Sequence, residues 1–151
     1  GFIIDFEYIS PNFQLNKKNY DFSYTYDNKC IVSNKFKEFC DRNKYKDVVF
    51  KTLQNKNKFF NLKIDNLVEI DTERKKYNYE NLCNECGNYE SITPGFPVIL
   101  KNKNVLPDGL FRTNLLTGNR NGKSYIYCIG LETYEKMKKE KFKGIHFIKI
   151  E

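Results

Sequence analysis

The chain has 151 residues, which suits a single domain over 1–151, and its hydrophobic content of 40% and aromatic content of 16% exclude wholesale disorder. It contains no run near the roughly 18 apolar residues of a membrane span and no signal-peptide pattern, so we expect a cytoplasmic protein that does not enter a membrane. A formal charge of +7 favours an acidic partner, although a Lys- and Asn-rich composition also explains it.

The N-terminal part of the chain carries two predicted strands. FIIDFEYI (2–9) is a short run of strand-forming residues that ends at a Ser-Pro-Asn turn signal. Phe22, Tyr24 and Tyr26 alternate with small polar residues, the period of two that a half-buried strand shows. A turn signal follows them, so we expect a hairpin-like start to the fold.

Two segments, 30–53 and 128–150, repeat one pattern, and each copy predicts a strand, a short helix and a strand. The matched residues are apolar: Cys30 with Cys128, Ile31 with Ile129, Phe36 with Tyr134, Phe39 with Met137, Tyr45 with Phe142, Val48 with Ile145 and Phe50 with Phe147. Because these positions carry no paired catalytic groups, we interpret the repeat as scaffold.

Each predicted helix has an apolar stripe that marks its buried face. In the first copy, Phe36, Phe39 and Cys40 lie at i, i+3 and i+4. Ser33 precedes them as an N-cap, and Asn43 is expected to end the helix in a left-handed conformation. The stripe of the second helix consists of Leu131, Tyr134 and Met137.

Six short apolar runs between turn residues predict further strands, and the first three are expected to form a meander. These runs are 48–50, 59–64, 67–70, 96–100, 124–129 and 145–150. Between them, residues 72–97 predict an irregular insertion that carries the sequence CNECG. We therefore expect an α+β fold, in which a mostly antiparallel sheet of about six to nine strands is covered on one side by the two helices.

Cys83 and Cys86, in the sequence CNECG, are the strongest chemical signal in the chain. Two thiolates at this spacing, with a glycine to free the turn, form half of a tetrahedral zinc site. The candidate ligands for the other half are Cys30, Cys40, Cys128 and His146. The three cysteines among them occupy apolar positions, where a cysteine acts as a small hydrophobe. A zinc site, a turn without metal, and a disulfide or redox pair all remain open.

Two weaker signals point to no reaction. GNRNGKS (118–124) is one residue short of a phosphate-binding loop, and a strand pattern follows it in place of a helix, so we expect a hairpin or loop tip. His146, the only histidine, lies in an apolar strand pattern and is expected to be structural. No Ser or Cys can be matched with a His and a carboxylate, so we expect no enzyme activity and no small-molecule substrate.

Four stretches of the chain resemble the immunity proteins of bacterial polymorphic toxin systems. They are IVSNKFKEFCDRNKYKDVVF, FFNLKIDNLVEID, GLFRTN and YIYCIGLETYEKMKKEKFKGIHF, within 30–71 and 96–151. The resemblance is to the immunity protein 43 type and to domain of unknown function 1629, and it rests on the order of elements and on short hydrophobic signatures. It implies an α+β domain that binds and neutralises a cognate toxin inside the cell that makes it. Some relatives carry paired CxxCG motifs, whereas this chain has one.

The resemblance brings no catalytic residues, so our first hypothesis is a non-enzymatic protein of the immunity type. The positive charge of the chain then predicts an acidic surface on the toxin. The alternative is a nucleic-acid-binding module that uses the basic stretch KMKKEKFK (136–143), with a zinc knuckle at the two cysteines. We expect the recognition surface in the CNECG insertion and in the 102–123 loops, because the repeats serve as scaffold.

Overall fold

The structure is a computed structural model that describes residues 9–10, 13–15, 19–26, 28–53, 56–101 and 105–150. The strand predicted at 2–9 lies outside the described residues, apart from its last position. The elements in chain order are β1 (Phe22–Tyr24), β2 (Cys30–Ser33), α1 (Asn34–Arg42), β3 (Val48–Leu53), β4 (Lys56–Ile64), β5 (Leu67–Val68), β6 (Asn78–Leu82), β7 (Tyr89–Thr93), β8 (Leu110–Thr113), β9 (Gly118–Asn119), the 3-10 helix η1 (Arg120–Gly122), β10 (Tyr127–Ile129) and α2 (Leu131–Glu140).

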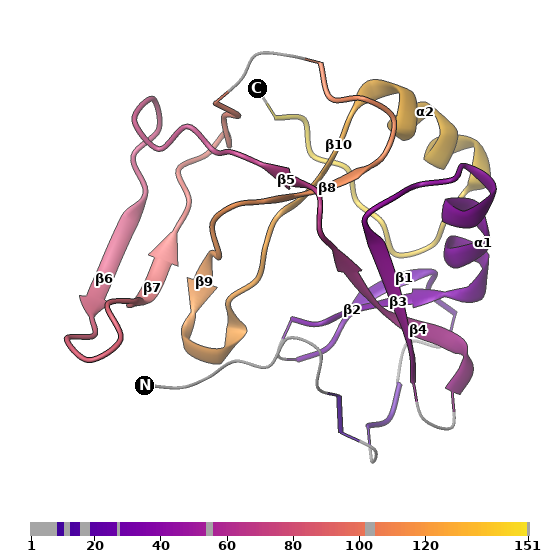
Figure 1. Cartoon of the computed structure of the whole chain (residues 1–151), viewed down its shortest axis with the longest axis horizontal. Helices are drawn as coiled ribbons and strands as arrows, with labels where there is room; N and C mark the ends of the chain where they lie inside the picture. Colours follow the sequence, from indigo (N-terminus) through magenta and orange to yellow (C-terminus); the bar gives the residue numbers. More distant parts are fainter. Residues whose placement is uncertain are drawn as a thin grey trace.

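These elements confirm the α+β class, but the strands divide among three small sheets. Their strand orders are β1-β2-β4-β3, β10-β8-β5 and β6-β7-β9. Within the described chain, β5 and β8 are the only pair of strands that run in parallel. Both helices lie on one side of the molecule, and β6 and β7 lie on the opposite side (Figure 1). No helix in the described part of the chain has the length and apolar character to cross a membrane.

The first repeat forms as predicted, with one difference at the end of its helix. The Ser33 hydroxyl accepts the N–H of Phe36 at 3.2 Å as an N-cap, and all three residues of the apolar stripe are buried. Asn43 keeps a right-handed conformation and donates its side-chain amide to a carbonyl one turn earlier at 2.8 Å. Lys44 takes the left-handed conformation instead, at φ 55°.

The two repeats meet in an aromatic core. Phe142, which follows α2, packs against Phe36 and Phe39 of α1 with ring centroids 5.2 and 5.3 Å apart. Met137 of α2 is buried in the same cluster. Several matched positions of the two repeats therefore meet in one core, whereas Tyr134 and Phe147 of the second repeat pack against each other.

The buried face of α2 differs from the predicted stripe. Met137 is buried as expected, but Thr133 is the other buried residue and Leu131 is 68% exposed. Thr133 is tolerated inside because its hydroxyl accepts the N–H of Gly109 at 2.9 Å and donates to Asp108 at 2.8 Å. The apolar pattern of the helix could not predict that Thr133 is buried, because its hydrogen-bond partners lie in a distant part of the chain.

The strand predicted at 145–150 is wrong, because this segment forms no strand. Just before it, the carbonyl of Lys143 accepts the N–H groups of Asp21 and Phe22 at 2.9 and 3.3 Å. The apolar side chains of the segment then serve as anchors, since Ile145 packs against the first core and Ile150 against the second.

The predicted meander forms only in part. β3 and β4 make an antiparallel hairpin, as expected. β5 instead joins another sheet, where the carbonyl of Asn66 accepts the N–H of Arg112 and that of Val68 accepts the N–H of Asn114, at 2.8 and 2.9 Å. The prediction that 67–70 forms the third strand of this meander is therefore wrong. The partner of β5 is β8, which lies far along the chain.

Residues 72–97 contain two strands, β6 and β7, where we predicted an irregular insertion. β6 and β7 form an antiparallel hairpin, and β7 also pairs with β9. The run at 96–100 is not a strand and contributes a single bridge, between Leu100 and Ile70. A second, smaller core anchors the hairpin and consists of Ile70, Tyr77, Ile92 and Val98.

Candidate protein-binding surface

The edge strand β6 is exposed along its whole length. All five of its residues are exposed, and no strand covers its outer edge among the described residues. An uncovered edge offers backbone N–H and C=O groups to another chain. Two large side chains, Tyr79 and Leu82, are 39% and 52% exposed on the same strand. Together these features suit a strand that accepts a segment of another protein.

Polar contacts hold the hairpin against the neighbouring turn of the chain. Glu90 of β7 accepts hydrogen bonds from Arg120 Nε at 2.5 Å and from Asn81 Nδ2 at 2.9 Å. The hydrogen bond from Arg120, followed by that from Asn81, holds the pKa of Glu90 below its usual range. Lys123 donates its ammonium group to the carbonyl of Tyr89. These contacts connect the hairpin that carries the exposed edge to the turn that follows β9.

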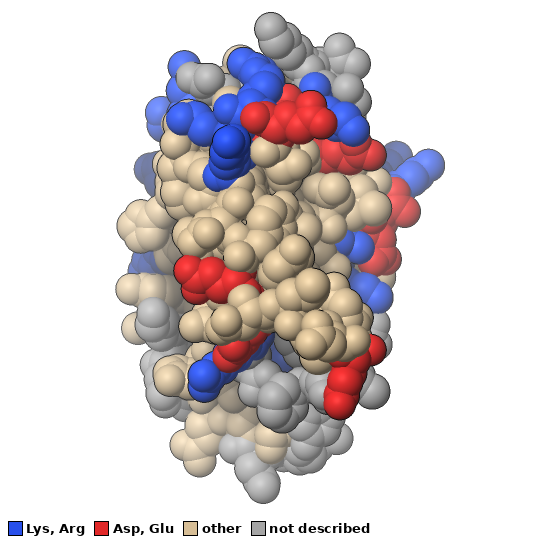
Figure 2. All heavy atoms as spheres, turned by 90° about the vertical axis from the view of Figure 1, so that its left-hand side faces the viewer, with Lys and Arg blue, Asp and Glu red and all other residues tan. Residues whose placement is uncertain are grey.

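The charges on this side of the molecule are unevenly distributed. Figure 2 shows the side on which β6 and β7 lie, where Lys and Arg side chains gather with acidic side chains at the upper end and a few acidic side chains also lie in the mostly uncharged middle. Arg74 and Lys76, in the loop that leads into β6, are exposed. Lys101 is also exposed and pairs with Glu69 at 3.2 Å. A largely uncharged surface bordered by charged residues suits contact with another protein.

Cys83 and Cys86 lie at the tip of the β6–β7 hairpin. Gly87 takes φ 70°, and its N–H donates to the carbonyl of Cys83 at 2.9 Å. Cys83 is half-buried and Cys86 is exposed. The pKa of the Cys83 thiol is lowered. The largest cause is a hydrogen bond from the backbone N–H of Cys86, followed by bonds from the Cys86 thiol and from the backbone N–H of Glu85. The two cysteines therefore share one turn at the tip of the hairpin, and a metal site there stays a prediction.

The other predicted ligands do not join this pair. Cys30, Cys40 and Cys128 are buried, and burial raises their pKa values, that of Cys128 to about 11. His146 is exposed in the C-terminal segment. No group of three or more His, Cys, Asp or Glu in the described part of the chain is placed to hold a metal ion.

The sequence GNRNGKS (118–124) forms the loop tip that we predicted. β9 leads into η1, and Thr117 and Ser124 form a bridge across the base of the turn. The segment after Lys123 is extended, so no helix N-terminus is present to bind a phosphate here.

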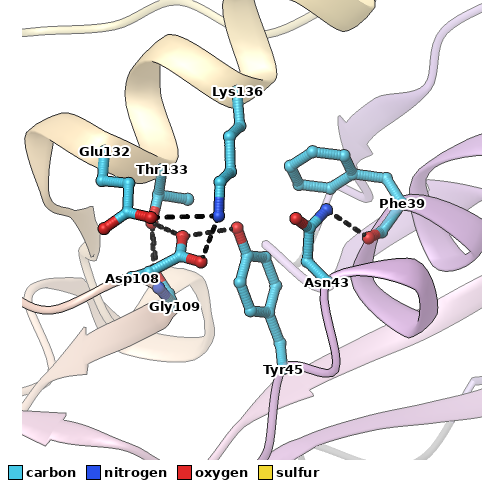
Figure 3. Close-up of polar contacts among 8 residues, drawn as sticks. All are labelled: Phe39, Asn43, Tyr45, Asp108, Gly109, Glu132, Thr133 and Lys136. Carbon is cyan, nitrogen blue, oxygen red and sulfur yellow. Dashed lines mark hydrogen bonds and ion pairs between the residues drawn. The ribbon is translucent and has the colours of Figure 1, made fainter.

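Asp108 is the centre of a polar cluster that the sequence did not reveal (Figure 3). Its carboxylate accepts hydrogen bonds from Tyr45 and Thr133 at 2.8 Å each and from Lys136 at 2.5 Å. Lys136 also pairs with Glu132 at 3.2 Å. The cluster joins the loop before β8 to the first repeat through Tyr45 and to α2 through the other residues.

The electrostatics of this cluster indicate a structural role. Partial burial acts to raise the pKa of Asp108, but the hydrogen bonds from Lys136, Tyr45 and Thr133 outweigh it and lower the pKa. Burial and the bond to the carboxylate raise the pKa of Tyr45. A carboxylate that already accepts from three donors is poorly placed to take a proton from a substrate.

Sequence reasoning missed β6 and Asp108 for different reasons. The sequence NYENL of β6 is polar and has no period of two, but a weak signal existed in the short runs on either side of the Gly87 turn, each with a Tyr and a branched apolar residue. For Asp108 the sequence offered only a Pro-Asp-Gly turn, and its three donors come from distant positions.

Comparisons of this chain with protein-family models, with curated proteins and with solved structures found no match.

Proposed function

We propose that the chain is a non-enzymatic protein-binding domain of the immunity type, which neutralises a cognate toxin in the cytoplasm by binding it. The observation that carries the binding role is β6, an edge strand exposed at all five residues with Tyr79 and Leu82 on its surface. The toxin as partner follows from the family resemblance of the sequence.

In this proposal, an extended segment of the toxin pairs with the outer edge of β6. Main-chain hydrogen bonds would supply affinity, and contacts with Tyr79 and Leu82 would supply specificity. The exposed Arg74 and Lys76 lie in the loop that enters β6, and the chain carries a net charge of +7. These charges would speed association with a toxin whose rim is acidic.

The non-enzymatic part of the proposal is supported by the polar groups. A polar cluster centres on Asp108, whose carboxylate accepts hydrogen bonds from three donors. Of the five cysteines, three are buried with raised pKa values, which disfavours the nucleophilic thiolate form.

The test first asks whether a toxin-like gene lies next to the gene for this chain, and then uses the product of that gene. Binding is measured by calorimetry for the wild type, for Leu82→Arg on β6 and for the matched control Leu131→Arg on α2, which lies on the opposite side (Figure 1). Both leucines are exposed, so neither change should unfold the chain. We expect Leu82→Arg to weaken binding by tenfold or more, about 1.4 kcal/mol, and Leu131→Arg to leave it unchanged. If both changes had the same effect on affinity, β6 would not be part of the interface. If the wild type did not bind at all, the proposed partner would be wrong.

The nucleic-acid alternative has less support from the basic stretch 136–143. Lys136 is engaged by Asp108 and Glu132, and Glu140 forms an ion pair with Arg42. Filter binding on mixed RNA and DNA decides the question. Affinity that falls steeply with salt would favour the nucleic-acid role, and the absence of retention at low salt would exclude it.

A further inference from the structure

Arg112 is the central residue of a row that crosses the sheet β10-β8-β5. It lies opposite Tyr127 of β10 in the antiparallel register and opposite Leu67 of β5 in the parallel register. Paired residues on neighbouring strands direct their side chains to the same face of a sheet. The three side chains therefore lie side by side, with a cation between an aromatic ring and an apolar group.

The guanidinium group of Arg112 is held in place by a second aromatic ring. Its central carbon lies 3.9 Å from the centre of the Tyr125 ring, well within the range of a cation–π contact. Arg112 is also half-buried. A planar guanidinium that already stacks on a ring loses little further freedom when it binds a carboxylate through two parallel hydrogen bonds. The stacking thus prepares Arg112 for an acidic group.

Arg112 keeps most of its hydrogen-bonding capacity for such a group. A guanidinium has five N–H donors, whereas the bond from Arg112 Nη1 to the carbonyl of Thr113 is a single long one of 3.4 Å. Glu69, which directly follows β5, pairs with Lys101 at 3.2 Å and leaves Arg112 without a neutralising partner from that side. The positive charge of Arg112 therefore stays open to a carboxylate from another molecule.

Exposed apolar groups lie on both sides of Arg112. Leu67 is 55% exposed, and Tyr24 of β1 is 46% exposed, with its ring centroid 6.5 Å from that of Tyr127. Arginine and tyrosine are enriched among the residues that contribute most to affinity at protein interfaces. The Arg112 patch consists of Tyr24, Leu67, Arg112, Tyr125 and Tyr127. Because it contains a single cation, it suits one carboxylate better than the row of phosphates on a nucleic acid.

We propose that the Arg112 patch binds a protein segment that carries an Asp or Glu side chain between apolar ones. The carboxylate accepts two parallel hydrogen bonds from the guanidinium. Its apolar neighbours contact Leu67 on one side and the tyrosines on the other. The net charge of +7 speeds the approach of such a segment. The patch lies in a different sheet from β6, so its binding does not depend on the proposed pairing of the toxin with β6.

The test uses the full reduced chain and the peptide LEFEL, acetylated and amidated so that its carboxylates lie on side chains alone. NMR follows the Arg112 Nε–Hε signal and the backbone signals of β5 and β8. We expect saturable shifts with a Kd on the order of 1 mM or below, and binding of the peptide LQFQL that is about tenfold weaker. No shift with LEFEL, or equal binding of the two peptides, would overturn the site. Shifts caused by a hexathymidylate strand alone would assign the patch to nucleic acid and overturn the proposed partner.

Variants of Leu67 test the site while Arg112 stays in place. Leu67→Glu puts a carboxylate opposite Arg112, where it pairs with the guanidinium and excludes the peptide. We expect this variant to bind LEFEL about tenfold more weakly or worse, whereas Leu67→Gln keeps most of the affinity. Leu131→Glu adds the same charge on α2 and should leave binding unchanged. All three changes are at exposed leucines, so the chain should fold, and thermal unfolding checks this. Equal affinity of Leu67→Glu and Leu67→Gln would overturn the role of Arg112.

Arg112→Lys tests the shape of the cation apart from its charge. The ammonium group of lysine cannot form two parallel hydrogen bonds as the guanidinium does, so we expect about tenfold weaker binding of LEFEL. Arg74→Lys, an exposed position in the loop before β6, is the matched control and should bind as the wild type does. Wild-type affinity in Arg112→Lys would overturn the paired hydrogen bonds to the carboxylate.

Discussion

The phenol of Tyr45 donates a hydrogen bond of 2.8 Å to the carboxylate of Asp108, which lies 63 residues further along the chain. The same carboxylate accepts from Thr133 and Lys136 of α2. One side chain thereby joins the first repeat, the loop before β8 and the second repeat. This junction is a polar counterpart of the aromatic core that lies between the two helices.

Asp108→Asn should destabilise the chain in a pH-dependent manner. The pKa of Asp108 is lowered in the folded state, so its stabilisation is complete above the ordinary Asp pKa and is lost as the pH falls through the lowered value. We expect a cost of about 1–3 kcal/mol at neutral pH, which shrinks in acid. Urea unfolding of wild type and variant at several pH values measures this difference.

The control for this measurement is Asp65→Asn. Asp65 is exposed and pairs with Lys63 at a distance of 3.8 Å. Exposed pairs of this kind contribute little, so the change should stay within about 0.5 kcal/mol. A cost for Asp108→Asn that is as small as that of the control, or that grows in acid, would contradict the role of the junction.

Tyr77→Phe and Tyr45→Phe should change stability in opposite directions. The hydroxyl of Tyr77 is buried in the second core without a hydrogen-bond partner among the described residues. Removing this hydroxyl removes the desolvation penalty of a buried polar group, so it should stabilise the folded chain by about 1 kcal/mol. Tyr45→Phe removes a satisfied bond and should cost about 0.5–1.5 kcal/mol. Thermal unfolding compares the two, and loss of stability in Tyr77→Phe would show that its hydroxyl has a partner.

Met137→Ala should destabilise the chain by about 2–5 kcal/mol, because it leaves a cavity in the first core. Phe39→Ala, in the same core, should cost a similar amount or more. Leu131→Ala on the same helix as Met137 is the control, and it should change stability by less than about 0.5 kcal/mol because Leu131 is exposed. Chemical denaturation of all three measures the difference. Similar values for Met137 and Leu131 would mean that α2 is rotated from the orientation described above.

Gly130→Ala tests the close approach of the loop before β8 to the start of α2. A Cβ at Gly130 would overlap the backbone carbonyl of Leu106, which cannot move aside as a side chain can. We expect a cost of about 1–3 kcal/mol from the enforced shift. Gly122→Ala is the matched control, since its Cβ would meet only a side-chain nitrogen of Asn28 at 3.4 Å. Equal thermal stability of the two variants would show that this loop does not press on Gly130.

The first repeat and the cysteine turn were predictable because their determinants are local. The Ser33 cap, the stripe of α1 and the CNECG turn each depend on residues within a few positions of one another. The failed predictions share the opposite property. β5 depends on β8, and Thr133 depends on Asp108 and Gly109, so their partners come from distant parts of the chain.

The sequence by itself determined the α+β class, the helix of the first repeat, the basic charge and the turn that carries Cys83 and Cys86. Only the tertiary structure decided that the strands form three sheets, that 145–150 anchors two cores without pairing, and that β6 is left as an exposed edge. Local patterns fix the conformation of a segment through neighbouring residues. Which edge remains uncovered depends on which distant strands find each other, and that is settled by the packing of the whole chain.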